Sequence, residues 1–207
     1  KTNSGLSANS LEQICQKFKL EIKNSIGEDF PDDPHTQLWG SIAAVFKSWN
    51  GKRAVSYRDI ENIPHKWGTA VNVQAMVFGN MGQNCATGVA FTRNPSTGKK
   101  ELFGEYLVNA QGEDVVAGIR TGNDISQLKT DMPKSYKELT NACHKLEKHF
   151  REVQDIEFTI EQGKFYLLQT RTAKMSAGAL VKTSVEMVKE NLINKDMALT
   201  RIPAQQL

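Results

Sequence analysis

The strongest constraint on the fold is the alternation of side chains along residues 153–171. In the first half of this stretch, the apolar side chains of Ile156, Phe158 and Ile160 fall on one face of an extended chain, and polar side chains fall on the other. A turn at Gln162-Gly163 then leads into a second run of the same kind. The sequence therefore predicts a β-hairpin with one apolar face and one polar face.

The length of the turn decides which side chains meet across this hairpin. A two-residue turn pairs Glu157 with Leu168 and sets a carboxylate beside an apolar side chain, whereas a three-residue turn, Gln162 to Lys164, pairs Glu157 with Gln169. In the second strand one face is predicted to hold Phe165, Leu167, Gln169 and Arg171. We prefer the three-residue turn, because it gathers four polar side chains on one face: Asp155, Glu157, Gln169 and Arg171.

This polar group has a chemical interpretation and a plainer alternative. Two carboxylates and an amide oxygen suit Mg²⁺, a hard cation that prefers oxygen ligands and shares them with phosphate. An arginine beside them can hold a phosphoryl oxygen and offset developing charge. The alternative is an ordinary surface hairpin in which Asp155 and Arg171 form a cross-strand ion pair. The pattern alone leaves both open.

The rest of the chain mixes helices and strands without strict alternation, which favours an α+β class. Apolar periodicity predicts helices at 8–26 (capped by Asn9 or Ser10), 34–49 (closed by a left-handed Asn50-Gly51), 53–61, 134–151 and 175–200, with a short helix or turn at 111–120. Besides the hairpin, strands are predicted at 70–78, 87–92 and 102–108. We expect three parts: a helical lobe at 1–65, a mixed lobe at 66–174 and a C-terminal helical linker at 175–207.

Composition narrows the classes of partner. The net charge is only +3, and basic residues are interleaved with acidic ones, so no nucleic-acid partner is expected. No run approaches the length of a membrane-spanning helix, and no signal peptide is visible. Three scattered cysteines, Cys15, Cys85 and Cys143, predict a reducing compartment such as the cytoplasm or an organelle matrix.

Five segments, in order along the chain, closely resemble the pyruvate, phosphate dikinase family: 68–80, 88–98, 109–120, 154–158 and 168–171. The resemblance runs from about Lys66 to Thr172 and more loosely through both ends. It implies an ATP-grasp fold, in which two lobes clamp a nucleotide over a sheet. It also implies transfer of the β-phosphoryl group of ATP through a phosphohistidine to pyruvate, with inorganic phosphate taking the γ-phosphoryl group.

The resemblance also assigns site residues. It implies that Glu157 and Gln169 coordinate Mg²⁺, with Asp155 beside them, and that Arg171 contacts the nucleotide phosphates as a catalytic residue. The backbone of Gln74, Ala75, Met76 and Val77 corresponds to the hinge that receives the adenine edge, and a strand can supply that donor and acceptor. Arg93 and Glu113 lie in strongly matching segments, and they are candidates for phosphate-binding or supporting residues.

The family pattern also contains parts that this chain does not match. Its glycine-rich phosphate loop, a nucleotide-binding lysine and a further arginine are expected upstream, and its phosphohistidine domain is expected beyond the 175–207 linker. We therefore expect the isolated chain to be inactive, and the full-length protein to form a homodimer. The alternatives are a phosphoenolpyruvate synthase or another dikinase-type enzyme, and, in a different class, a non-catalytic binding module that docks a partner through its helical ends.

Overall fold

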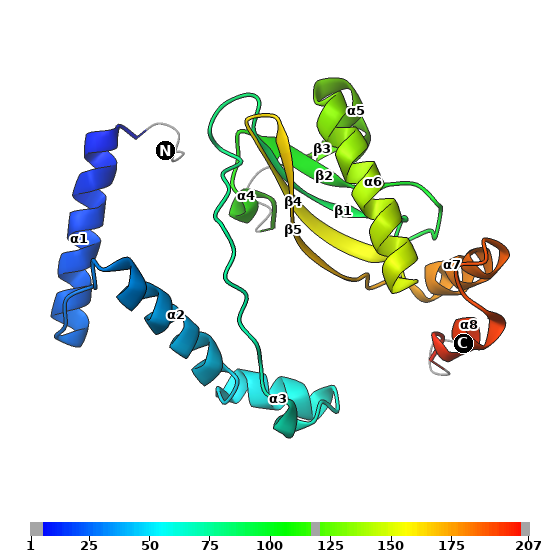
Figure 1. Ribbon diagram of the computed structural model, residues 1–207, viewed down its shortest axis with the longest axis horizontal. Coiled ribbons are helices and arrows are strands. Elements are labelled where there is room, and N and C mark those ends of the chain that lie inside the picture. Colours follow the sequence, from blue (N-terminus) through cyan, green and yellow to red (C-terminus); the bar gives the residue numbers. More distant parts are fainter. Residues whose placement is uncertain (1–5, 117–120, 204–207) are drawn as a thin grey trace. The chain divides into compact units, whose positions relative to one another are not determined.

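The computed structural model describes residues 6–116 and 121–203, and the chain forms two compact units, Lys1–Gln74 and Ala75–Leu207 (Figure 1). The first unit contains helices α1 (Ala8–Ile26), α2 (Pro34–Ser48) and α3 (Lys52–Ile60) and the 3₁₀ helix η2 (His65–Trp67). The helices of the second unit are α4 (Gly112–Val116), α5 (Leu128–Asp131), α6 (Pro133–Phe150), α7 (Ala177–Lys189) and α8 (Lys195–Thr200), with the 3₁₀ helix η3 (Ile125–Gln127). Its strands are β1 (Ala86–Phe91), β2 (Phe103–Val108), β3 (Asn123–Asp124), β4 (Gln154–Glu161) and β5 (Lys164–Thr172).

The helices of the first unit lie where the sequence predicts them, but two of their ends differ. The side chain of Ser7, rather than that of Asn9 or Ser10, caps α1 by accepting a hydrogen bond from the backbone N–H of Ser10. The predicted left-handed end at Asn50-Gly51 is wrong, since Gly51 is extended with φ −65° and ψ 144°. Helix α3 begins directly after Gly51, and an N-cap residue needs this extended backbone.

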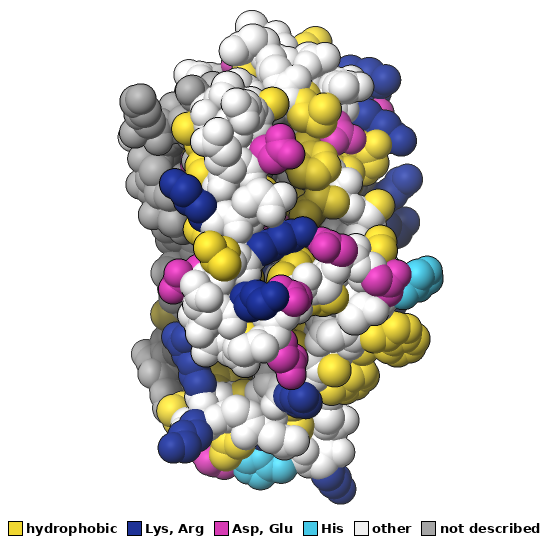
Figure 2. Space-filling model, turned by 90° about the vertical axis from the view of Figure 1, so that its left-hand side faces the viewer, with side chains coloured by type: hydrophobic (Ala, Val, Ile, Leu, Met, Phe, Trp, Pro, Cys, Tyr) yellow, Lys and Arg dark blue, Asp and Glu magenta, His cyan; other side chains and the backbone are white. Residues whose placement is uncertain are grey.

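A buried arginine holds the first unit together where α2 and α3 meet. Arg58 is only 4% exposed, its guanidinium lies 3.9 Å from the centre of the Trp49 ring, and its Nη1 donates to the Trp49 carbonyl at 2.7 Å. Its Nε donates to Nδ1 of His65 at 3.0 Å. No residue of α1 or α2 is buried in the described structure. On the face drawn in Figure 2, hydrophobic side chains are exposed between basic and acidic ones.

The predicted strand at 70–78 is wrong. This segment belongs to none of the strands in the described part of the chain, and its side chains are largely exposed, 78% in the case of Met76. Alternation of residues favours an extended backbone, but a strand also needs a neighbour to complete its hydrogen bonds. The sequence pattern could not show that the described structure provides no such neighbour.

The second unit is built on a five-stranded antiparallel sheet in the order β3-β2-β1-β4-β5. Helices α5 and α6 cover one face, and the core there includes Tyr106, Leu139, Cys143 and Phe158 (Figure 1). Gly88 is required at the centre of this face, because a Cβ atom there would lie 2.6 Å from the Phe158 ring. Burial, with Glu147 nearby, raises the pKa of the Cys143 thiol to about 12, so this thiol stays protonated at neutral pH.

The opposite face of the sheet is only partly covered. Helix α4 packs Val115 against Leu107 and Val89, while the part of the face formed by β4 and β5 carries polar side chains. A separate apolar cluster of Val153, Met187 and Ile193 holds α7 and the following turn in the same unit. The mixed helices and antiparallel sheet agree with the predicted α+β class. The three-part division of the chain at 1–65, 66–174 and 175–207 stays a prediction.

All three cysteines are free thiols. Among residues 6–116 and 121–203, no helix combines the length and apolar character needed to cross a membrane.

Two glycines with positive φ, Gly98 in the loop before β2 and Gly163 in the β4–β5 turn, should differ in how much their replacement by alanine destabilises the protein. Gly98 has φ +68°, and a Cβ atom there would lie 2.9 Å from the carbonyl oxygen of Ala179 in α7. Gly163 has φ +76° but nothing within 4 Å. Gly163→Ala should therefore cost about 1 kcal/mol of stability from backbone strain alone. Gly98→Ala should cost about 1–3 kcal/mol more, because the loop and α7 must separate.

Thermal unfolding of both variants, with amide hydrogen exchange of α7, measures this difference. Exchange in α7 should accelerate for Gly98→Ala and stay unchanged for Gly163→Ala. Equal losses of stability in the two variants would contradict the predicted contact.

Candidate functional site

The β4–β5 hairpin reaches the predicted pairing by a different route. Its turn has two residues, Gln162 and Gly163, with φ +50° and +76°, because Glu161 pairs directly with Lys164. The predicted three-residue turn is therefore wrong. A β-bulge then shifts the register by one residue, and it leaves Leu168 without a partner. Beyond the bulge the predicted pairs are confirmed: Glu157 with Gln169 and Asp155 with Arg171.

The bulge also decides which face each side chain of β5 occupies. Before it, Phe165 pairs with Ile160 and its ring lies 5.8 Å from that of Phe158, on the face covered by α6. After it, Gln169 and Arg171 share the opposite face with their partners on β4. The prediction that Phe165, Leu167, Gln169 and Arg171 lie on one face is thus wrong. One extra residue reverses the side-chain alternation, since strands alternate with period two.

Asp155 and Arg171 form the one ion pair of this polar face in the described residues. The Nε atom of Arg171 donates to Oδ2 of Asp155 at 2.7 Å. The Asp155 side chain is 12% exposed and that of Arg171 is 63% exposed. The hydrogen bond to Asp155 raises the pKa of Arg171 above its usual value. Because only Nε is engaged within the described residues, the terminal N–H groups of the guanidinium are available to an anion.

Glu157 and Gln169 face each other beside this ion pair, and neither side chain is hydrogen-bonded to another described residue. A small cavity of about 30 Å³ lies next to Glu157, lined also by Leu168 and by Val115 of α4. Within residues 6–116 and 121–203 no three His, Cys, Asp or Glu side chains converge on one point. A carboxylate and an amide oxygen are nevertheless a fitting donor set for Mg²⁺, which usually binds one or two protein oxygens together with phosphates and water.

A third carboxylate on this face was not predicted from the sequence. Val89 of β1 pairs with Glu157 on one side and with Glu105 of β2 on the other. Directly paired residues share a face, so Glu105 and Glu157 flank Val89 on the polar side of the sheet. Only the strand order β2-β1-β4 reveals this arrangement, because Glu105 and Glu157 are far apart along the chain.

Arg93 is not available to bind phosphate. It is completely buried, and its guanidinium donates to Glu147 of α6 at 2.7 Å and to Glu190, the residue that follows α7, at 2.8 Å. Burial by itself would lower the pKa of Arg93, but the hydrogen bonds to these two glutamates raise it above its usual value. Arg93 instead links the end of β1 to α6 and α7. Its buried charge was not recognisable in the sequence.

The other predicted site residues lie outside the β4–β5 hairpin. Glu113 lies in α4, and the end of the matching segment 109–120, residues 117–120, lies outside the described residues. The segment Gln74–Val77 crosses the boundary at which the first unit ends and the second begins. It is followed by Phe78, whose backbone N–H donates to the carboxylate of Glu161 at 2.9 Å.

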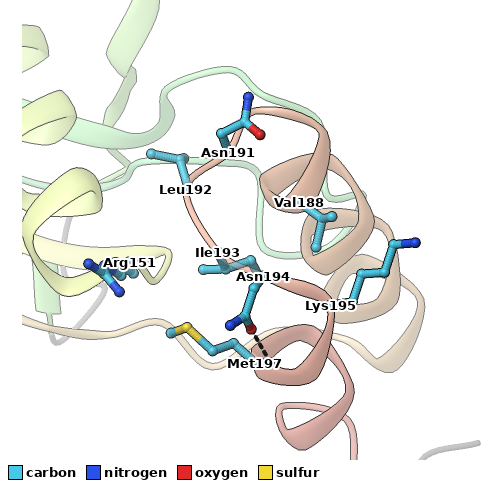
Figure 3. Close-up of a pocket in the computed structure, with 8 residues that line it drawn as sticks. All are labelled: Arg151, Val188, Asn191, Leu192, Ile193, Asn194, Lys195 and Met197. Atoms are coloured by element: carbon cyan, nitrogen blue, oxygen red, sulfur yellow. Dashed lines mark hydrogen bonds between the residues drawn. The ribbon is translucent and has the colours of Figure 1, made fainter.

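An open hollow of about 490 Å³ lies at the turn between α7 and α8 (Figure 3). Arg151 and Lys195 stand at its edge, and the apolar side chains of Ile193 and Met197 also line it. The amide oxygen of Asn194 is already engaged, since it caps α8 by accepting from the backbone N–H of Met197. None of the predicted site residues lines this hollow.

Comparison with known proteins identifies the family of the chain. The family described as "Pyruvate phosphate dikinase, AMP/ATP-binding domain" matches residues 4–135 and 132–192. The chain therefore belongs to a family of AMP/ATP-binding domains.

Individual relatives narrow the family of the chain further. The chain is 53% identical over 206 residues to pyruvate, phosphate dikinase of Clostridium symbiosum and 52% identical over 214 residues to that of Rhizobium meliloti, matches that cover 99% and 98% of the chain. It is 48% identical over 205 residues, or 99% of the chain, to the chloroplastic enzyme of Flaveria trinervia. The chain belongs to the pyruvate, phosphate dikinase family. It spans about a quarter of the length of these relatives: 24%, 24% and 22%.

The buried position of Arg93 predicts a large effect on stability. Arg93→Met should destabilise the protein by about 3–5 kcal/mol, because Glu147 then keeps a buried charge without its partner. Lys100→Met is the matched control. Lys100 pairs with Glu190 at 2.8 Å but is exposed, so its loss should cost less than about 1 kcal/mol. Urea unfolding of both variants measures the difference, and equal losses would contradict a buried role for Arg93.

The same network predicts a dependence on pH. Burial alone would raise the pKa of Glu190, but hydrogen bonds from Arg93 and Lys100 outweigh it and lower that pKa below its ordinary value of 4.5. A lowered pKa in the folded state stabilises the protein above the unfolded value, and this contribution is lost as the pH falls through the folded value. The stability difference between wild type and Glu190→Gln should therefore stay constant near neutral pH and shrink as the pH falls below about 4.5. A difference that grows on acidification would contradict this sign.

Proposed function

We propose that this chain supplies the ATP-binding part of an enzyme that transfers the β-phosphoryl group of ATP to pyruvate. The transfer proceeds through a phosphohistidine and yields phosphoenolpyruvate, AMP and diphosphate, with inorganic phosphate accepting the γ-phosphoryl group, and it is reversible. Family membership supports the reaction. The observation that carries the location of the site is the pairing of Glu157 with Gln169 beside the Asp155–Arg171 ion pair.

Glu157 and Gln169 are proposed to hold Mg²⁺. Their side chains face each other across two strands, project from the same face and have no competing partner among the described residues. When bound, Mg²⁺ would offset the negative charge of the phosphates. Strands position these two ligands more rigidly than loops would, which favours a fixed geometry for the phosphates.

Arg171 is proposed as the catalytic cation, with Asp155 as its positioning residue. The bond from Nε to Asp155 restricts the guanidinium, and its terminal N–H groups make no hydrogen bond to another described residue. Two parallel N–H donors match two phosphoryl oxygens, an arrangement that a lysine could not reproduce. Charge that develops on the transferred group is thereby offset by a cation already held in place.

The rest of the proposal concerns the base, the fold and the partners. The backbone of Gln74, Ala75, Met76 and Val77 is proposed to receive the adenine edge, within an ATP-grasp arrangement. Partners in the full-length protein are its own phosphohistidine domain, reached through the C-terminal helices, and a second subunit. The free cysteines support a reducing compartment, the cytoplasm or an organelle matrix.

Replacing one metal ligand in the intact enzyme tests the proposed site. Glu157→Ala should lower the rate of histidine phosphorylation from ATP by about 10²–10³-fold, the range found when a group that stabilises transition-state charge is removed. The measurement is incorporation of label from ATP radiolabelled at the β-phosphate. Glu138→Ala is the control, since Glu138 lies on α6 over the opposite face of the sheet.

The control should phosphorylate at the wild-type rate. A Glu157→Ala enzyme that keeps a near-normal rate would contradict the metal site and would favour a non-catalytic binding role for this domain.

A further inference from the structure

The tip of the β4–β5 hairpin is fastened to the segment that precedes β1. The backbone N–H of Gly163 donates to the carbonyl of Asn84 at 2.8 Å. The backbone N–H of Gln162 donates to Sγ of Cys85 at 3.2 Å, and Cys85 is completely buried. These contacts join the strand pair that carries Glu157 and Gln169 to the loop at 78–85.

Gly79 fixes the start of this loop from the other side. Its carbonyl accepts from the backbone N–H of Ala110 at 3.0 Å. It is buried, and a Cβ atom there would lie 2.5 Å from the Ala110 carbonyl oxygen and 2.8 Å from that of Ala86. The chain therefore has one well-defined path at Gly79.

Just before Gly79 the backbone has few constraints. In the described structure, the hydrogen bond to the backbone of residues 70–77 is a long one of 3.4 Å, from the Thr69 hydroxyl to the Ala70 carbonyl. The first firm bond is made by the N–H of Phe78, which donates to Oε1 of Glu161 at 2.9 Å. Glu161 is the last residue of β4, four positions beyond Glu157 on the same strand.

The hydrogen bond from Phe78 to Glu161 also orients the carbonyl group of Val77. In a trans peptide the N–H of Phe78 and the C=O of Val77 lie in one plane and point in opposite directions. A carboxylate that holds this N–H therefore also sets the direction of the Val77 carbonyl, away from Glu161. The Val77 carbonyl belongs to the segment proposed to receive adenine, whose 6-amino group needs an acceptor.

We propose that Glu161 is a positioning residue for recognition of the nucleotide base. It orients the Val77–Phe78 peptide from the same strand that carries the proposed metal ligand Glu157. One rigid strand would therefore set the distance between the base site and the phosphate site. This inference rests on the proposed function, since it assumes that the segment ending at Val77 contacts adenine. The uncovered side chain of Met76, next in the chain to Val77, agrees with a flat apolar ligand at this place.

Two substitutions in the intact enzyme test this role. Glu161→Ala removes the acceptor and should raise the KM for ATP about tenfold, the effect of losing one hydrogen bond to a charged group, with kcat changed less than about twofold. Glu161→Gln keeps an oxygen that accepts the Phe78 N–H and should restore the KM to within about threefold of wild type. Glu138→Ala serves again as the surface control.

A second readout separates base positioning from a loss of stability. Inosine triphosphate has a carbonyl where adenine has its 6-amino group, so it cannot donate to the Val77 carbonyl. The preference for ATP over inosine triphosphate in kcat/KM should therefore shrink in Glu161→Ala and persist in Glu161→Gln. Weakened packing alone would reduce the use of both nucleotides equally.

The outcomes are distinguishable. An unchanged KM and an unchanged base preference in Glu161→Ala would overturn the proposal. An equal loss for both nucleotides, shared by Glu161→Gln, would also overturn it and make Glu161 a structural residue. Failure of the proposed function itself would show differently, as a wild-type enzyme in which ATP does not phosphorylate a histidine.

Discussion

The polar face of the sheet depends on one unpaired residue, Leu168. The tight Gln162-Gly163 turn alone would place Glu157 opposite an apolar side chain. The bulge at Leu168 moves the rest of β5 by one position, so that Gln169 and Arg171 turn toward the carboxylates of β4. The same bulge leaves Phe165 and Leu167 on the core face, where Phe165 packs with Phe158. One strand thus contributes to the core at one end and to the proposed site at the other.

A second constraint fastens the C-terminal helices to this sheet. Arg93 is fully buried and bonds to Glu147 and Glu190, so a cation at the end of β1 connects α6 with α7. A buried ion pair contributes little net stability, because desolvation offsets most of the attraction, but it strongly disfavours any arrangement that leaves one charge alone. The network therefore specifies where α7 lies.

The contacts of the hairpin connect the proposed metal site with the proposed adenine-binding segment. Glu157 and Gln169 stand near the middle of β4 and β5, while Glu161 at the end of β4 reaches the backbone next to the proposed adenine segment. Strands are stiff over this distance, so the proposed metal site and base site keep a fixed spacing. Arg171 and its partner Asp155 extend the same row in the opposite direction.

The sequence by itself determined the secondary structure of most segments and the α+β class, since periodicity and turn residues act locally. It predicted the pairs Glu157–Gln169 and Asp155–Arg171 correctly, but from a three-residue turn that the structure does not have. The five matching segments also identified the family. The tertiary structure decided what depends on neighbours: that residues 70–78 have no strand partner in the described chain, that Glu105 joins the polar face, and that Arg93 is buried rather than exposed to phosphate. The tertiary structure also decided the position of the β-bulge at Leu168. A slip of one residue costs nothing in local pattern, and only packing of Phe165 on one face and of Leu168 near α4 on the other fixes it.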